Sequence, residues 1–151
     1  MSIKLRVSIP DQTVAVVQDG QTVWCAPVST SVYGTGSEQG SFRTPVGRFV
    51  VAERIGEGAP VGARFVGRVF TGYVWQPGEG VDEDWILTRI LWLDGLDPEN
   101  SNTKSRYIYF HGTNHEDRIG IPTSHGCIRL RNADMVTLFD WTPLGAEVWI
   151  G

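Results

Sequence analysis

Residues 111–130, HGTNHEDRIGIPTSHGCIRL, contain all three histidines of the 151-residue chain and one of its two cysteines. Three glycines, one proline and one asparagine interrupt this segment, which is typical of an irregular loop. Three structures are consistent with such a loop: a metal site, a nucleophile beside its base, or an ordinary turn around a buried cysteine. The flanking sequence and the residue types inside the loop help to distinguish them.

The composition predicts one soluble globular domain over residues 1–151, because 41% of the residues are hydrophobic and 20% are charged. The formal net charge is −4 and the charges are scattered, without a basic stripe for nucleic acid or a basic amphipathic segment for a membrane surface. The longest apolar runs are far below the roughly 20 residues of a membrane span. We therefore expect neither nucleic acid nor a membrane as a partner.

The first residues alternate between polar and apolar types over 3–9, which predicts a half-buried strand. A secretory signal would instead carry an apolar run of about 7–15 residues after a charged start. The expected location is therefore the cytoplasm. The alternative is a periplasmic protein from which a leader has been removed.

Strands are expected at residues 3–9, 13–18, 21–28, 48–52, 64–75, 85–93, 106–110 and 146–150. Asp19-Gly20 lies between the second and third of these and is typical of a tight hairpin. One helix is predicted, with Asn132 as its N-cap, apolar residues at helical spacing, and Pro143 and Gly145 at its end. The predicted fold class is mainly β with one late α-helix.

Two residues have simple structural interpretations. Cys25 lies in an apolar strand-like run, so we predict a small buried hydrophobic residue rather than a disulfide partner. His115 is followed by Glu116 and Asp117, which favours a solvated loop position.

A metal site is disfavoured by the spacing of its nominal ligands. His111, His115, His125 and Cys127 supply four ligand types that zinc accepts. The i, i+4 spacing of the first two aligns side chains only in a helix, and the intervening Gly112 makes a helix unfavourable. We therefore expect no metal and no cofactor.

The nucleophile interpretation explains more of the loop. A thiol attacks as its thiolate, and a free cysteine with a pKa of about 8.5 is mostly protonated at neutral pH. His111, at the end of the predicted strand 106–110, is the expected base for Cys127, and the Gly112 carbonyl is a candidate to orient its ring. Gly126 permits close backbone approach, so the N–H groups of residues 126 and 127 are expected to face a developing oxyanion.

Two further features leave alternatives open. Arg129 follows the nucleophile by two residues and either binds a substrate carboxylate or pairs with a carboxylate that holds the loop. The polar segment 76–84 and Trp85 form either a lid over the site or a solvent-exposed connection.

These motifs resemble the L,D-transpeptidase catalytic domain, also called the YkuD-like family. The downstream part of the match is His111-Gly112, then Ser124-His125-Gly126-Cys127-Ile-Arg-Leu, then Asn132-x-Asp134 and a helix. The upstream part is Pro27-Val28-Ser29-Thr30 and Thr44-Pro45-Val46-Gly47-Arg48-Phe49. The resemblance spans nearly the whole chain, and its Ser-His-Gly-Cys element is highly specific.

The resemblance implies a β-sandwich of mixed sheets and a cysteine enzyme that cleaves peptidoglycan tetrapeptide stems. Such enzymes attack the bond between an L-centre, usually diaminopimelate, and a terminal D-alanine, and pass the resulting thioester to an amine or to water. By matching positions, Cys127 is the nucleophile and His111 the base, while Ser124, His125 and Gly126 frame the oxyanion site. Ser124 and Arg129 are the expected substrate-binding residues.

Three features differ from many members of the family: the sequence has no recognisable signal peptide, no peptidoglycan-binding module such as a LysM repeat, and Ser31-Val32-Tyr33 where a glycine often follows Ser-Thr. We therefore expect an L,D-carboxypeptidase that trims soluble muropeptides during murein recycling. The alternatives are an exported L,D-transpeptidase that forms crosslinks or exchanges D-amino acids, and a non-catalytic module that binds muropeptides. The intact Cys127 and His111 argue against the last.

Overall fold

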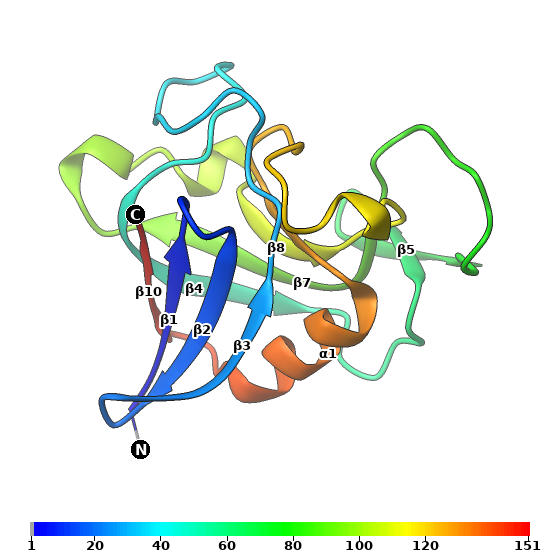
Figure 1. Ribbon diagram of the computed structural model, residues 1–151, viewed down its shortest axis with the longest axis horizontal. Helices are drawn as coiled ribbons and strands as arrows, with labels where there is room; N and C mark the ends of the chain where they lie inside the picture. Colours follow the sequence, from blue (N-terminus) through cyan, green and yellow to red (C-terminus); the bar gives the residue numbers. More distant parts are fainter. Residues whose placement is uncertain (1) are drawn as a thin grey trace.

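The computed structural model describes residues 2–151. Ten strands in this range form one connected mixed sheet with the order β3-β2-β1-β10-β4-β7-β5-β6, and β8 joins it by pairing with β7 and β9 (Figure 1). The single α-helix of this range has ten residues and is too short and insufficiently apolar to cross a membrane. The mainly-β fold with one late helix, predicted from the sequence, is confirmed.

The strands are β1 (Ile3–Ser8), β2 (Thr13–Gln18), β3 (Gln21–Pro27), β4 (Gly47–Ile55), β5 (Ala63–Val66), β6 (Val69–Val74), β7 (Ile86–Gly95), β8 (Tyr109–Gly112), β9 (Ile128–Leu130) and β10 (Glu147–Ile150). The helix α1 spans Asn132–Trp141, and three short 3-10 helices, η1 (Pro98–Asn100), η2 (Lys104–Arg106) and η3 (Glu116–Arg118), lie in the connections.

The N-terminal hairpin forms as predicted, but it exposes Cys25. Asp19 and Gly20 both have positive φ (50° and 83°), the conformation that a tight two-residue hairpin requires. Side chains alternate along β3, so Ala26 turns into the core and Cys25 is left exposed. The prediction of a buried Cys25 is therefore wrong.

Residues 64–75 form two strands instead of the single strand predicted. The chain reverses at Gly67 and Arg68, which both have positive φ (56° and 65°), and β6 then pairs antiparallel with β5. An alternating pattern does not reveal a reversal within it, because each half keeps the same period of two. The strand β5 also pairs with β7, so the hairpin extends the sheet beyond β7.

The strand β8 begins at Tyr109, later than the predicted strand 106–110. Arg106 belongs to η2, and Tyr107 adopts the left-handed conformation with a φ of 58°, which interrupts an extended chain. The strand continues through His111 and Gly112, and it pairs antiparallel with β7 and parallel with β9. His111 therefore lies within the sheet rather than in the following loop.

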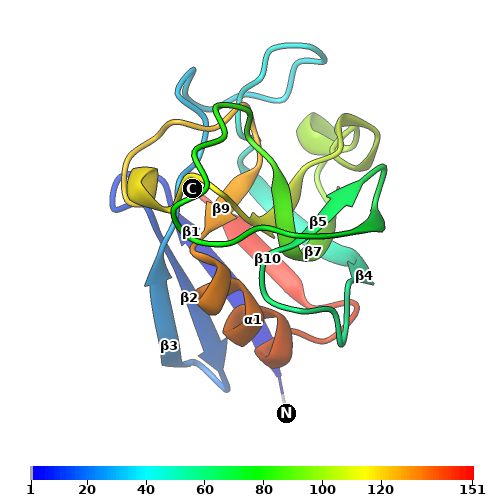
Figure 2. The ribbon, with the colours of Figure 1, turned by 90° about the vertical axis from the view of Figure 1, so that its right-hand side faces the viewer.

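The main core lies between the sheet and α1, which crosses the sheet in Figure 2. Met135 and Phe139 of α1 are buried there with Leu91 of β7 and Phe110 of β8. A second, smaller cluster is formed by Ala63, Phe65, Ile90 and Tyr109, with Cys127 packed against it. The nucleophile predicted from the sequence thus rests on its own small apolar layer.

Asn132 is the first residue of α1 and not its N-cap, which is Arg131. The Asn132 side chain is 3% exposed; it accepts a hydrogen bond from Thr88 Oγ1 (2.6 Å) and donates one to the Thr113 carbonyl (2.9 Å). Its backbone N–H donates to Glu116 Oε2 (2.8 Å). Asn132 therefore ties the start of the helix to β7 and to the segment that follows His111.

We expect Asn132→Ala to lower the free energy of unfolding by about 1–3 kcal/mol, because the Thr113 carbonyl loses its donor and the Thr88 O–H loses its acceptor in the interior. Urea denaturation measures this change. Thr137→Ala, which removes an exposed hydroxyl on the same helix, serves as the control and is expected to change stability much less. Equal effects of the two substitutions would contradict the bridging role.

Candidate active site

The parallel pairing of β8 with β9 places the two predicted catalytic residues on one face of the sheet. His111 is opposite Arg129 in this pairing, and Cys127 precedes Arg129 by two residues. Residues two apart on an extended chain point the same way, so Cys127, Arg129 and His111 share a face. Tyr109, two residues before His111, lies on this face as well and packs with Cys127.

The Cys127 thiol is protonated in the resting site. The side chain is partly buried, and its sulfur donates a hydrogen bond to the Tyr107 carbonyl (3.4 Å). Burial raises the pKa of the Cys127 thiol to about 12. Within residues 2–151, no hydrogen bond joins this sulfur to the His111 ring.

The His111 ring is buried and has a defined tautomer. Its Nδ1 lies 2.6 Å from the Gly112 carbonyl oxygen, which can only accept, so Nδ1 carries the hydrogen and Nε2 has the free lone pair. Burial lowers the pKa of His111 below its ordinary value, and the nearby Asp84 carboxylate offsets part of this shift. A neutral imidazole is the form that can accept a proton.

Gly112 has a steric reason to be glycine. A Cβ at this position would lie 2.3 Å from Asn132 Oδ1 and 2.8 Å from the Leu87 carbonyl oxygen. The backbone after His111 therefore packs directly on its neighbours, which fixes the carbonyl that holds the imidazole.

Asp84 is a site residue that the sequence analysis missed. Its Oδ1 lies 3.2 Å from Arg129 Nη1 and accepts a hydrogen bond from Thr113 Oγ1 (3.1 Å). Burial acts to raise the pKa of Asp84, but the charges of His111 and Arg129 outweigh it and lower this pKa. Its position in the sequence was the signal that could have identified it, because Asp84 ends an acidic loop two residues before β7, the strand that pairs with β8.

Arg129 takes the second of its two expected roles. The residue is only 1% exposed, and in addition to the Asp84 ion pair its Nη2 donates to Ser29 Oγ (3.1 Å) and to Thr123 Oγ1. The guanidinium thus pairs with a carboxylate and braces the loop.

The hydroxyl groups of Ser124 and Thr44 hold the Ser124–Cys127 turn in place. Ser124 Oγ donates to the Cys127 carbonyl (2.7 Å) and accepts from the Gly126 N–H (3.3 Å). Gly126 has a φ of 121°, which favours glycine, and its carbonyl accepts from Thr44 Oγ1 (3.0 Å). The Gly126 N–H, expected at an oxyanion, is therefore engaged inside the turn.

His125 is exposed, unlike its neighbours in the turn. Its ring stacks on Tyr33 with a centroid distance of 5.9 Å and lies 5.8 Å from the Phe42 ring. The structure thus places His125 in a small surface cluster of aromatic rings from the segment 30–45, which lies beside the catalytic loop in Figure 1.

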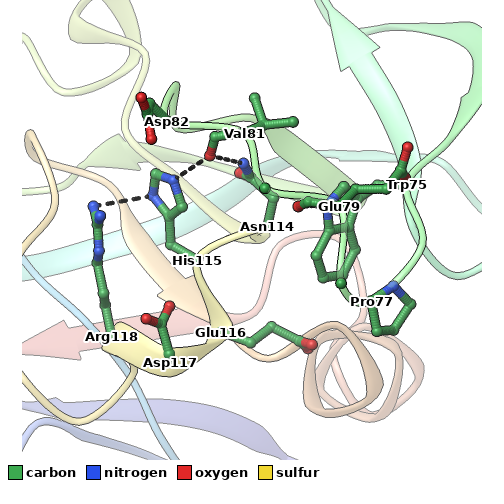
Figure 3. A pocket seen from close by; sticks show the side chains of 12 residues that line it. Trp75, Pro77, Glu79, Val81, Asp82, Asn114, His115, Glu116, Asp117 and Arg118 are labelled. Atoms are coloured by element: carbon green, nitrogen blue, oxygen red, sulfur yellow. Dashed lines mark hydrogen bonds between the residues drawn. The ribbon is translucent and has the colours of Figure 1, made fainter.

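His115 is buried, at 6% exposed, so its prediction as a solvated loop residue is wrong. Its Nε2 lies 2.9 Å from the Val81 carbonyl oxygen, and its Nδ1 lies 3.3 Å from Arg118 Nη1 (Figure 3). Asn114 Nδ2 donates to the same Val81 carbonyl (3.1 Å) and to that of Glu83 (2.8 Å). These contacts tie the 76–84 loop to the segment after β8 and form one wall of a hollow of about 460 Å³.

The four nominal zinc ligands do not form a metal centre. The His115 ring binds the 76–84 loop, His111 binds the Gly112 carbonyl, and His125 stacks on the surface. Across residues 2–151, no group of three or more histidine, cysteine, aspartate or glutamate side chains is arranged to hold a metal ion.

Residues 2–150 match the family model described as the L,D-transpeptidase catalytic domain (YkuD). A probable L,D-transpeptidase, YbiS, of Escherichia coli strain K12 is 49% identical over 43 residues, 28% of this chain and 14% of that protein. The putative L,D-transpeptidase YqjB of Bacillus subtilis is 44% identical over 48 residues, 32% of this chain and 27% of that protein.

Among solved structures, an L,D-transpeptidase from Mycobacterium smegmatis superposes with a TM-score of 0.62 at 16% identity. The match covers 99% of this chain and 58% of that one, and it demonstrates a shared fold. Since the family model extends from residue 2 to residue 150 and the fold agrees, the chain belongs to the L,D-transpeptidase catalytic domain family.

Proposed function

We propose that this protein cleaves the bond between the L-centre and the terminal D-alanine of peptidoglycan tetrapeptide stems through a thioester on Cys127, with water as the acceptor. The observation that carries the proposal is the placement of Cys127 and His111 on the same face of the adjacent strands β8 and β9, with Nε2 of the imidazole free to accept a proton. The L-centre is diaminopimelate, and the activity is that of an L,D-carboxypeptidase in murein recycling.

The reaction begins with proton transfer from sulfur to His111. Substrate binding turns the Cys127 side chain away from the Tyr107 carbonyl, and Nε2 of the neutral imidazole removes the thiol proton as the sulfur attacks the L-centre carbonyl. The C–S bond forms, and the carbonyl oxygen becomes an oxyanion. The N–H of Cys127 is the remaining backbone donor proposed for it, because the Gly126 N–H is engaged by Ser124.

Collapse of the tetrahedral intermediate breaks the C–N bond, and the imidazolium returns its proton to the departing D-alanine amine. Water then attacks the thioester with His111 again as base, which releases the tripeptide acid and restores the thiol. In this scheme the Gly112 carbonyl holds the imidazole, Ser124 and Gly126 shape the turn, and Arg129 fixes Asp84 beside the base.

The alternative acceptor is an amine, which makes the chain an L,D-transpeptidase, as the relatives YbiS and YqjB are named. Both activities share the thioester. A cytoplasmic location accompanies the hydrolytic proposal, and cell fractionation with an antibody against the native protein tests it.

Mass spectrometry of products from a disaccharide tetrapeptide separates these activities. We expect free D-alanine and tripeptide, with no exchange when another D-amino acid is added in excess. Dimers or exchanged stems would instead identify the acceptor as an amine. If the tetrapeptide is recovered unchanged, the enzymatic proposal is overturned, and a non-catalytic muropeptide-binding module is the remaining alternative.

We expect Cys127→Ala to reduce turnover by about 1,000-fold or more while the protein stays folded, because no other group replaces the nucleophile. Cys25→Ser is the matched control; since Cys25 is exposed, it is expected to keep both activity and thermal stability. Circular dichroism verifies the fold of both variants. Appreciable turnover by Cys127→Ala, or loss with Cys25→Ser, would exclude the thioester at position 127.

We expect Asp84→Asn to move the acid limb of the pH dependence of kcat/KM to lower pH. The pKa of His111 is lowered by burial and raised by the Asp84 carboxylate, so removing this charge lowers the pKa further and keeps the imidazole neutral in more acid solution. Because Asp84→Asn also removes the ion-pair partner of Arg129, the melting temperature of the variant is measured across the pH range to identify where it is folded. A limb that stays in place or moves to higher pH would contradict His111 as the base.

A further inference from the structure

The tip of the β5–β6 hairpin places one guanidinium on a platform of aromatic rings. The Arg68 guanidinium carbon lies 4.8 Å from the centroid of the Trp92 ring and 5.3 Å from that of Tyr107. Its Nη1 donates to the Tyr109 hydroxyl (3.2 Å). Three side chains from β7, β8 and the segment before β8 thus hold the end of Arg68.

This platform adjoins the nucleophile. Tyr107 supplies the carbonyl that accepts the Cys127 thiol hydrogen bond, and Tyr109 belongs to the apolar cluster on which Cys127 packs. Trp92 is opposite Tyr109 in the β7–β8 pairing, and their rings meet edge to face. Arg68 therefore lies on the catalytic face of the sheet, above residues that touch the reacting sulfur.

Among residues 2–151, no carboxylate forms an ion pair with Arg68; the Glu53 carboxylate, which pairs with Lys104, acts on the Arg68 charge from beyond ion-pair distance. Within residues 2–151, other cations of this region form ion pairs, such as Lys104 with Glu53 (3.0 Å) and Arg129 with Asp84 (3.2 Å), but no carboxylate oxygen lies within 4.0 Å of Arg68. One of its N–H groups donates to the Tyr109 hydroxyl, which leaves most of the N–H donors of the guanidinium fork for a ligand.

We propose that Arg68 binds a carboxylate of the substrate beside Cys127. This inference rests on the proposed function, because a tetrapeptide stem provides two carboxylates near the scissile bond: the one at the far end of the diaminopimelate side chain and the terminal one of the departing D-alanine. A guanidinium matches a carboxylate in a two-pronged geometry, and aromatic rings beneath it reduce the water that competes for it. Arg68 is thus a specificity residue that positions the stem.

Binding to the inactive Cys127→Ala protein tests the proposal without chemistry. Calorimetry compares the tetrapeptide with two analogues, one amidated at the diaminopimelate side-chain carboxylate and one at the terminal carboxylate. We expect Arg68→Gln to weaken binding of the unmodified stem by roughly 10- to 100-fold. Amidation of the recognised carboxylate should weaken binding by a similar factor when Arg68 is present. It should have little further effect on the affinity of the Arg68→Gln variant.

Arg64→Gln is the matched control, since Arg64 belongs to the same hairpin and its guanidinium carbon also stacks on an indole, that of Trp85 (3.9 Å). It is expected to leave the amidation effect intact, whereas Arg68→Lys should retain part of the preference. In the active protein, Arg68→Gln should raise KM more than it lowers kcat. Melting temperatures verify that each variant is folded.

The Arg68 assignment would be overturned if the unmodified stem bound equally well to the Cys127→Ala protein with and without Arg68→Gln. It would also be overturned if amidation changed the affinity of these two proteins by the same factor. If the active protein turns over the tetrapeptide in these cases, the proposed function stands and only the inference fails. If the tetrapeptide is neither bound nor cleaved, the proposed function and the inference fall together.

Discussion

The parallel pairing of β8 and β9 is the constraint on which the site depends. It brings the residue before β9, Cys127, to the face on which β8 presents His111, although sixteen positions separate the two in the chain. The connection between them is tied at several points rather than left free, through Asn132, Asn114 and the buried Arg129. A loop that contains three glycines and one proline can therefore end in a defined geometry.

The buried ion pair between Arg129 and Asp84 connects this geometry to the electrostatics of the base. Breaking such a pair leaves an uncompensated charge in the interior, which is strongly unfavourable, so each residue holds the other in place. Asp84 in turn offsets part of the burial effect on the pKa of His111. In the resting site, burial therefore favours the neutral forms of both the His111 imidazole and the Cys127 thiol.

Two groups of aromatic rings near Cys127 differ in chemistry. In one group, His125 stacks with Tyr33 and lies beside Phe42 at the surface. In the other, Arg68 rests on Trp92 and Tyr107, and no carboxylate of residues 2–151 forms an ion pair with it. In the proposed function, the first group offers aromatic rings to a stem peptide and the second offers a cation.

The sequence by itself determined the local features of this protein: the N-terminal hairpin from Asp19-Gly20, the late helix, the mainly-β class and, through the Ser-His-Gly-Cys motif, the family. These features depend on residues close together in the chain, whose periodicity and turn chemistry are legible. Only the tertiary structure decided that Cys25 is exposed, that His115 is buried, that residues 64–75 fold back at Gly67-Arg68, and that Asp84 reaches Arg129. Each of these depends on which strand lies beside which, because burial and pairing across long separations arise from the register of the assembled sheet and not from the neighbours in sequence.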